Sequence, residues 1–183
     1  PEFLLNSGEN NDAKIDSMYM RILKGNLITS EDFGPNFDMW RVNFTLARTY
    51  SGGGLAELAL NTVAGGPDLC SGGTILYGST GLGVANADYA FDDLIDTGYW
   101  AGEDNAITNG TSWIGYDKGS AVRPVEVALT ARYGGDAIMM AQEFYLQGSD
   151  DGIDWYNVQH FPAGYVGDVF TSNETRSLAV ETG

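Results

Sequence analysis

The chain contains very little cysteine, histidine and lysine, and each shortage excludes a class of site. There is one cysteine and one histidine among 183 residues. Cys70 therefore has no partner for an intrachain disulfide, and a zinc site built from several cysteines or histidines is excluded. No apolar run approaches the ~18 residues of a membrane-spanning helix, so membrane insertion is not expected. The first residues also lack the basic and then apolar pattern of a signal peptide.

Positive charge is scarce as well. The chain has 25 acidic residues against nine lysines and arginines, and its formal net charge is −16 at pH 7. A surface this acidic repels phosphate backbones and anionic lipid headgroups, which argues against nucleic-acid and membrane-surface partners. Divalent cations and neutral ligands such as sugars remain compatible with it.

Short apolar stretches separated by glycines make up most of the chain, which contains 25 glycines. The segment "MWRVNFTLA" (39–47) alternates between two faces and is rich in aromatic and β-branched residues, which predicts a strand. Residues 54–63 fit a helix or a strand equally well. The other expected strands lie within 112–117, 123–133, 142–149 and 154–161. Asp151-Gly152 predicts a hairpin between the last two, because glycine accepts the positive φ of a tight turn. Short strands with almost no helical pattern indicate an all-β protein.

The first 35 residues differ from the rest. "PEF" at the start resembles a cloning remnant, and "NSGENNDAK" (6–14) is polar enough to remain flexible. "MYMRILKGNLI" (18–28) is apolar and fits a helical turn, an extra strand or a docking arm. We therefore expect residues 1–35 to consist of a cloning remnant, a flexible segment and a docking arm. Residues 18–35 would pack on the rest of the domain or on another subunit, since they are apolar.

No motif in the sequence supports catalysis. His160, the single histidine, is not accompanied by the G-x-S-x-G elbow of a serine hydrolase. The glycine-rich stretch "GSTGLGVAN" (78–86) lacks the third glycine and the following helix of a dinucleotide-binding loop. No pair of carboxylates stands out for glycoside hydrolysis. The expectation is a protein that is not an enzyme.

Three segments, read in order, resemble the discoidin family, also called coagulation-factor C-type domains. They are "AFDDLIDTGYW" (90–100), "WIGYDKG" (113–119) and "FYLQGSDDGIDW" (144–155). They resemble that family's "A-F-D-G-N-x-x-T-x-W" loop, its "W-I-x-x-D-L/F-G" strand and its "F-x-L-x-x-S-x-D-G-x-x-W" hairpin. The resemblance implies a galactose-binding-like jelly-roll β-sandwich of about eight strands over residues 36–183.

The order of the segments departs from that family. "MWRVNFTLA" and "LAELAL" (55–60) resemble the family's last strands but come first here. A circular shift of this kind is tolerable when the termini lie on neighbouring strands. The shifted order resembles modules of bacteriophage tail and capsid proteins, which implies a virion or another extracellular location.

The resemblance also implies a structural calcium ion, which would explain why three aspartates crowd into residues 90–100. By position, the side chains of Asp92, Thr97 and Glu57 and carbonyls near Tyr89 and Leu94 would supply the oxygens. Calcium accepts six to eight oxygen ligands in irregular geometry. The alternative is a solvated acidic loop without a metal.

Two positions in this loop differ from the family pattern. Asp93 stands where the family has glycine, so it needs a backbone angle that aspartate tolerates. Leu94 replaces an asparagine, which changes little where only a carbonyl is required.

The four tryptophans are expected in the core. Trp100, Trp113 and Trp155 stand at motif positions that build the sandwich interior in the family, and Trp40 lies on the first expected strand. Ligands in the family bind to loops at one end of the barrel, near the calcium. The candidates for stacking on a sugar and for hydrogen bonding to it are Tyr99, Tyr133, Arg132, Tyr50, Arg48, Asp104 and Tyr165.

These observations together favour a non-catalytic carbohydrate-binding module, displayed on a phage virion or a similar assembly and recognising neutral sugars. Two alternatives stay open. One is a purely structural decoration or assembly protein of a virion. The other is an ancillary module of a larger glycan-active enzyme. Fold alone does not separate the three.

Overall fold

The structure, a computed structural model, describes residues 35–48, 50–80, 86–96, 98–133, 139–165 and 170–181. All of them belong to one compact unit, Pro35–Glu181. Apart from Pro35, the expected docking arm at residues 18–35 lies outside the described residues.

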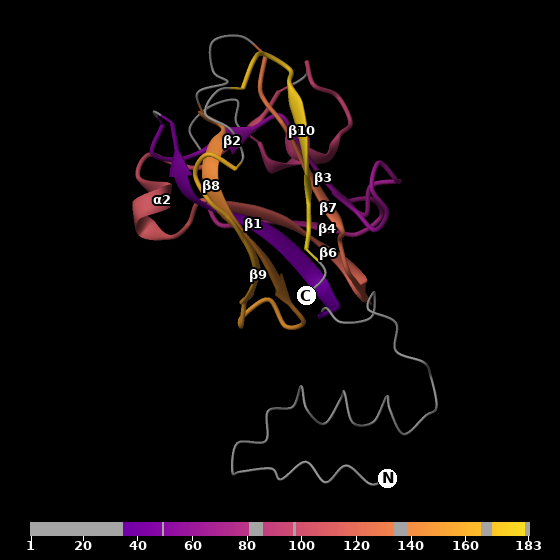
Figure 1. The fold of residues 1–183 in the computed structure, drawn as a ribbon. Coiled ribbons are helices and arrows are strands. Elements are labelled where there is room, and N and C mark those ends of the chain that lie inside the picture. The colour runs from indigo at the N-terminus through magenta and orange to yellow at the C-terminus, as the bar shows by residue number, and fades with distance from the viewer. Residues whose placement is uncertain are drawn as a thin grey trace, which may run out of the picture. The chain divides into compact units, whose positions relative to one another are not determined.

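The described unit is an all-β sandwich, as the sequence predicts (Figure 1). Its larger sheet has the strand order β4-β6-β1-β8-β9, and its smaller sheet has the order β10-β7-β3. A short pair, β2-β5, completes the strands, and every recorded pairing is antiparallel. The strands are β1 (Phe37–Ala47), β2 (Gly54–Leu55), β3 (Glu57–Asn61), β4 (Thr74–Tyr77), β5 (Trp100–Ala101), β6 (Trp113–Val122), β7 (Glu126–Thr130), β8 (Ala141–Ser149), β9 (Tyr156–Phe161) and β10 (Thr175–Ala179). The helical elements are η2 (Ala87–Phe91), which is a 3₁₀ helix, and α2 (Ala106–Asn109).

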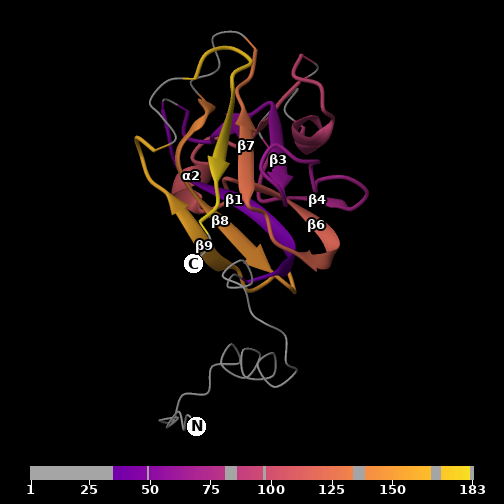
Figure 2. The same cartoon turned by 45° about the vertical axis from the view of Figure 1, so that its right-hand side comes forward.

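The core lies between the two sheets, whose strands run in different directions in Figure 2. Strand β1 contributes Trp40, Val42 and Phe44, all of them buried, and β8 contributes Phe144 and Leu146. Alternate residues of a strand point to opposite faces, so the residues between them lie on the outer face of the larger sheet. Fully burying each of these large apolar side chains stabilises the fold by ~1.5–3 kcal/mol.

The predicted hairpin between β8 and β9 is confirmed. Gly152 has a φ of 71° in the connection, and the two strands pair antiparallel. The Asp151 carboxylate accepts hydrogen bonds from the backbone N–H groups of Ile153 (2.8 Å) and Asp154 (2.9 Å), which closes the turn. These backbone donors also lower the pKa of Asp151, because they stabilise its ionised form.

The prediction of a buried position is confirmed for two tryptophans and wrong for the other two. Trp40 and Trp100 are buried, whereas Trp113 and Trp155 are only half-buried. The strand register explains the first difference, because Trp113 pairs with Asn43 and so lies on the outer face of the larger sheet. Trp155 follows the hairpin turn, where its Nε1 donates to the carbonyl of Gly152.

Candidate functional site

Several chain segments meet at one end of the sandwich, the upper end in Figures 1 and 2. Glu57 begins β3 opposite Thr130, the last residue of β7, and Thr130 pairs in turn with Thr175, the first residue of β10. The hydroxyls of Thr130 and Thr175 lie 2.8 Å apart. This alignment brings the loops before β3, after β7 and before β10 to the same end of the smaller sheet.

Glu57 and Asp92, two of the expected calcium ligands, lie close together at this end. The backbone N–H of Leu94 donates to Glu57 Oε1 (3.0 Å) and to Asp92 Oδ1 (2.8 Å). Burial raises the pKa of Glu57 to about 8, and the neighbouring Asp92 carboxylate raises it as well. Two carboxylates that share one donor repel each other unless a proton or a cation lies between them. The pair is thus suited to bind a divalent cation.

The rest of the expected calcium set is less complete. The ring of Tyr89, on η2, packs so closely against Gly98 that a side chain at that position would clash with it. Thr97 lies outside the described residues. Within the described part of the chain, no cluster of three or more acidic, histidine or cysteine side chains is placed to hold a metal. Carbonyl, amide or hydroxyl oxygens would therefore have to complete a calcium shell.

We call the segment that carries Asp92, Asp93 and Asp96 the acidic loop. Two features in or beside it affect whether oxygens could complete a calcium shell. Asp93 has a φ of 60°, the left-handed conformation that glycine adopts most easily and that aspartate tolerates. Asn173 donates from Nδ2 to Asp96 Oδ1 (3.3 Å). The Oδ1 atom of Asn173 is buried and has no hydrogen-bond partner among the described residues. It is an uncompensated oxygen beside the acidic loop.

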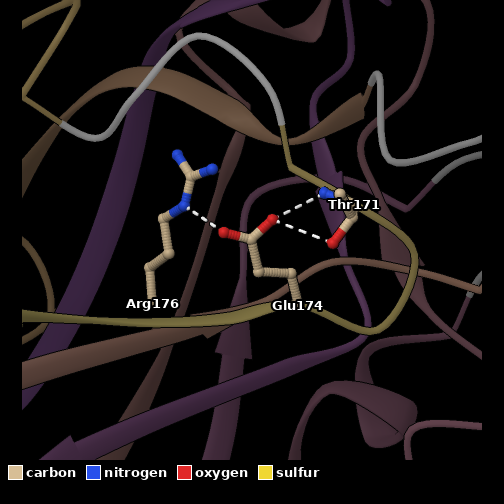
Figure 3. A network of polar contacts seen from close by, with 3 residues as sticks. All are labelled: Thr171, Glu174 and Arg176. Carbon is tan, nitrogen blue, oxygen red and sulfur yellow. Dashed lines mark hydrogen bonds and ion pairs between the residues drawn. The ribbon is translucent and has the colours of Figure 1, made fainter.

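A network of polar contacts holds the turn that carries Asn173 (Figure 3). Glu174 Oε2 accepts from the backbone N–H of Thr171 (2.6 Å) and from its hydroxyl (3.1 Å). Glu174 Oε1 accepts from Arg176 Nε (2.6 Å). The contact with Arg176 and the donors of Thr171 lower the pKa of Glu174 to about 2. The ionised carboxylate thus fastens the turn that precedes β10.

Glu174→Gln is expected to destabilise the protein at neutral pH and to reduce its sensitivity to acid. The pKa of Glu174 falls from its ordinary value of 4.5 to about 2 on folding. Its contribution is therefore complete above pH 4.5 and is lost as the pH falls to about 2. Thermal unfolding of both proteins from pH 7 to pH 2 should give melting temperatures that converge at low pH. Glu181→Gln, at an exposed residue, is the control, and a constant gap at all pH values would contradict the expectation.

Four of the seven expected ligand residues come together in what we call the loop cluster, formed by Tyr50, Tyr99, Asp104 and Arg132. The guanidinium of Arg132 lies 3.7 Å from the centre of the Tyr99 ring. The Tyr50 hydroxyl lies 3.0 Å from the carbonyl oxygen of Gly102. Burial raises the pKa of Tyr50, with further contributions from Asp104 and then from Tyr99. The cluster combines two aromatic rings, a cation and a carboxylate on separate loops.

The other three candidates are exposed side chains. Arg48 is exposed just after β1. Tyr133 follows Arg132, and 69% of its surface is exposed. Tyr165 is also exposed, and its ring lies 5.8 Å from that of Phe161.

Sequence reasoning missed a second cluster, on the outer face of the larger sheet. We call it the sheet-face cluster, formed by Arg41, Trp113, Gln147, Trp155 and Asn157. The signal for it was present in the alternation of β1, because Arg41 falls between the inward Trp40 and Val42. The assignment of Trp113 and Trp155 to the core obscured it.

Comparisons of the chain with protein-family models, with curated proteins and with solved structures found no match. Among the described residues, no helix is long and apolar enough to span a membrane.

Proposed function

We propose that this chain is a non-catalytic carbohydrate-recognition module that binds neutral sugars at its loop cluster. The observation that supports it best is the stack of Arg132 on Tyr99 beside Tyr50 and Asp104. A tyrosine ring offers an apolar face to the C–H groups of a sugar ring, while the carboxylate and the guanidinium offer hydrogen-bonding partners for hydroxyls. The acidic surface disfavours sulfated and sialylated ligands at this end.

A structural calcium ion is part of this proposal. Glu57 and Asp92 would hold it with their carboxylates, carbonyls near Tyr89 and Leu94 would add oxygens, and Thr97 is the further expected ligand. The ion would neutralise the carboxylate pair and fix the acidic loop, so that ligand binding does not incur the cost of ordering it. The shared donor of Glu57 and Asp92 and the raised pKa of Glu57 support a cation there.

The family and the location of the protein are proposed on the same basis. We infer a discoidin-like jelly roll in circularly shifted form, and the two-sheet antiparallel sandwich is compatible with it. The left-handed Asp93, at the position where the family has glycine, supports this inference. Display on a phage virion or another extracellular assembly follows from the order of the motifs. A second copy or a virion neighbour would contact residues 18–35.

Tyr99→Ala is expected to abolish sugar binding while leaving the fold intact. A shallow site with one stacked ring and a few hydrogen bonds reaches about −4 to −6 kcal/mol, which corresponds to millimolar to tens of micromolar dissociation constants. Loss of the stacking ring removes most of this binding free energy. A glycan array of neutral sugars, followed by calorimetry on any sugar that binds, measures the effect.

Tyr165→Ala is the matched control for this test, because Tyr165 is an exposed tyrosine outside the loop cluster. An equal loss of sugar binding in both variants would contradict the assignment of the loop cluster as the sugar site. No binding of the unmodified protein to any glycan would contradict the proposed function and favour a structural virion protein. Release of reducing ends from an oligosaccharide would instead indicate an enzyme.

A further inference from the structure

The sheet-face cluster is organised around Arg41. Its guanidinium carbon lies 4.0 Å from the ring centre of Trp155 and 4.6 Å from that of Trp113. The two indoles come from the strand on one side of β1 and from the hairpin connection beyond β8. Their ring centres lie 5.9 Å apart. Cation–π contacts of this kind hold a guanidinium in a fixed place.

A chain of side-chain amides fixes the orientation of Arg41 as well. Arg41 Nε donates to Gln147 Oε1 (2.7 Å), and Gln147 Nε2 donates to Asn157 Oδ1 (2.6 Å). Gln147 is buried, whereas Asn157 is exposed at the edge of the cluster. The Nε–H of the guanidinium is therefore used by the protein, and its two Nη groups make no hydrogen bond within the described structure.

Within the described part of the chain, Arg41 has no acidic partner. Among the described residues, no carboxylate lies within 4.0 Å of Arg41, although the chain carries 25 acidic residues. Burial lowers the pKa of Arg41 to about 10, and no neighbouring charge offsets that effect. A half-buried guanidinium that has lost part of its water and has no anionic partner is strongly favoured to pair with an incoming anion.

We propose that the sheet-face cluster is a second ligand site, which binds the carboxylate of a uronic acid residue in an acidic polysaccharide. The planar pair of Nη groups matches a carboxylate, which accepts two parallel hydrogen bonds. The two indoles beside the guanidinium provide apolar surface for the C–H face of the sugar ring. Asn157, at the exposed rim, can hydrogen-bond a hydroxyl.

The large negative net charge does not prevent such binding. Charges farther away than the Debye length of ~8 Å are screened at physiological ionic strength, whereas Arg41 would touch the ligand directly. The site does not depend on the neutral-sugar function proposed for the loop cluster, because the two clusters share no residue.

The test is calorimetric titration with trigalacturonate and with its fully methyl-esterified form, in the presence of a chelator. The chelator is needed because calcium can bridge a uronate to the acidic loop. The unmodified protein should bind the acid and bind the ester at least ~10-fold more weakly, since the ester lacks the charge that strengthens the hydrogen bonds. Tryptophan fluorescence should change on binding, because two indoles line the site.

Arg41→Gln should weaken binding of the acid at least ~10-fold, and Arg41→Lys should weaken it less, because lysine keeps the charge and loses the two-pronged geometry. Arg132→Gln, in the loop cluster, is the matched control and should leave this affinity unchanged. Equal binding of acid and ester, equal binding by Arg41→Gln, or no binding of the acid would each overturn the proposal. If Arg41→Gln fails to fold, the comparison of acid and ester on the unmodified protein still decides. Loss of neutral-sugar binding in Tyr99→Ala, with uronate binding retained, keeps the two sites distinguishable.

Discussion

Trp100→Ala is expected to lower the free energy of unfolding by ~3–5 kcal/mol, a large share of the stability of a domain. Trp100 is fully buried, its Nε1 donates to the carbonyl of Ser79 (2.9 Å), and its ring meets Phe44 edge-on. The substitution leaves a large cavity and an unsatisfied carbonyl. Chemical denaturation, with the slope checked for two-state behaviour, measures the loss.

Trp155→Ala is the natural comparison for this result. Trp155 is half-buried and contacts Arg41 and Trp113 on the outer face of the sheet, so its removal should cost less than ~2 kcal/mol. The two variants therefore separate a core tryptophan from a surface one. Equal losses would contradict the strand register that places the sheet-face cluster outside the core.

Glu57→Gln is expected to abolish the stabilisation of the protein by calcium. At a calcium concentration 100 times the dissociation constant, binding to the folded state adds ~2.7 kcal/mol of stability to the unmodified protein. The variant should lose this gain, because one of the two carboxylates is gone. In chelator at neutral pH, however, it should be more stable than the unmodified protein by about 1 kcal/mol, because Glu57, whose pKa rises to about 8 on folding, must take up a proton to fold and glutamine need not.

The structure explains both the lost response to calcium and the gain of stability in chelator. The glutamine oxygen can still accept from the backbone N–H of Leu94, so the local hydrogen bond survives while the cost of burying a carboxyl group beside Asp92 disappears. Asp96→Asn is the control, since Asp96 belongs to the same loop but contacts Asn173 instead. Melting curves with calcium and with chelator test the prediction. A preserved calcium response in Glu57→Gln, or none in the unmodified protein, would contradict it.

Much of the fold could be predicted from local patterns in the sequence. The alternation in residues 39–47 and the turn at Asp151-Gly152 correctly indicated β1 and the β8–β9 hairpin. Residues 54–63 were ambiguous because glycine, alanine and leucine suit either structure. Their conformation is decided by pairing with β5 and β7, which lie far away along the chain.

The buried face of a strand was harder to predict than the strand itself. In residues 113–116 both alternating sets contain an aromatic residue, Trp113 in one and Tyr116 in the other, so the pattern does not say which side is buried. The pairing of Trp113 with Asn43 determines that Trp113 lies on the outer face. This pairing joins two distant parts of the chain, so the local sequence does not reveal it. The resemblance to discoidin domains placed both Trp113 and Trp155 on the wrong side.

The candidate sites combine residues that are distant in sequence, which limits what the sequence alone can indicate. Glu57 and Leu94 are separated by 37 positions, and only the family resemblance suggested that they meet. The loop cluster draws on three segments that end at the same edge of the sandwich. Arg41 was not predicted as a site residue, because its neighbours across the sheet, Trp113 and Gln147, are known only from the register.

The position of β1 in the larger sheet has a consequence for how the protein is made. β1 is the first described strand along the chain, yet it lies at the centre of its sheet, between β6 and β8. Arg41 and its partner Gln147 are separated by 106 positions. At ~5–20 residues per second, a ribosome needs roughly 5–20 s to add the second strand after the first. Throughout that interval the nascent chain carries Trp40, Val42 and Phe44 on a strand that lacks one of its two neighbours in the sheet. Folding must therefore wait for β8, which makes the protein a slow folder that is exposed to aggregation during translation.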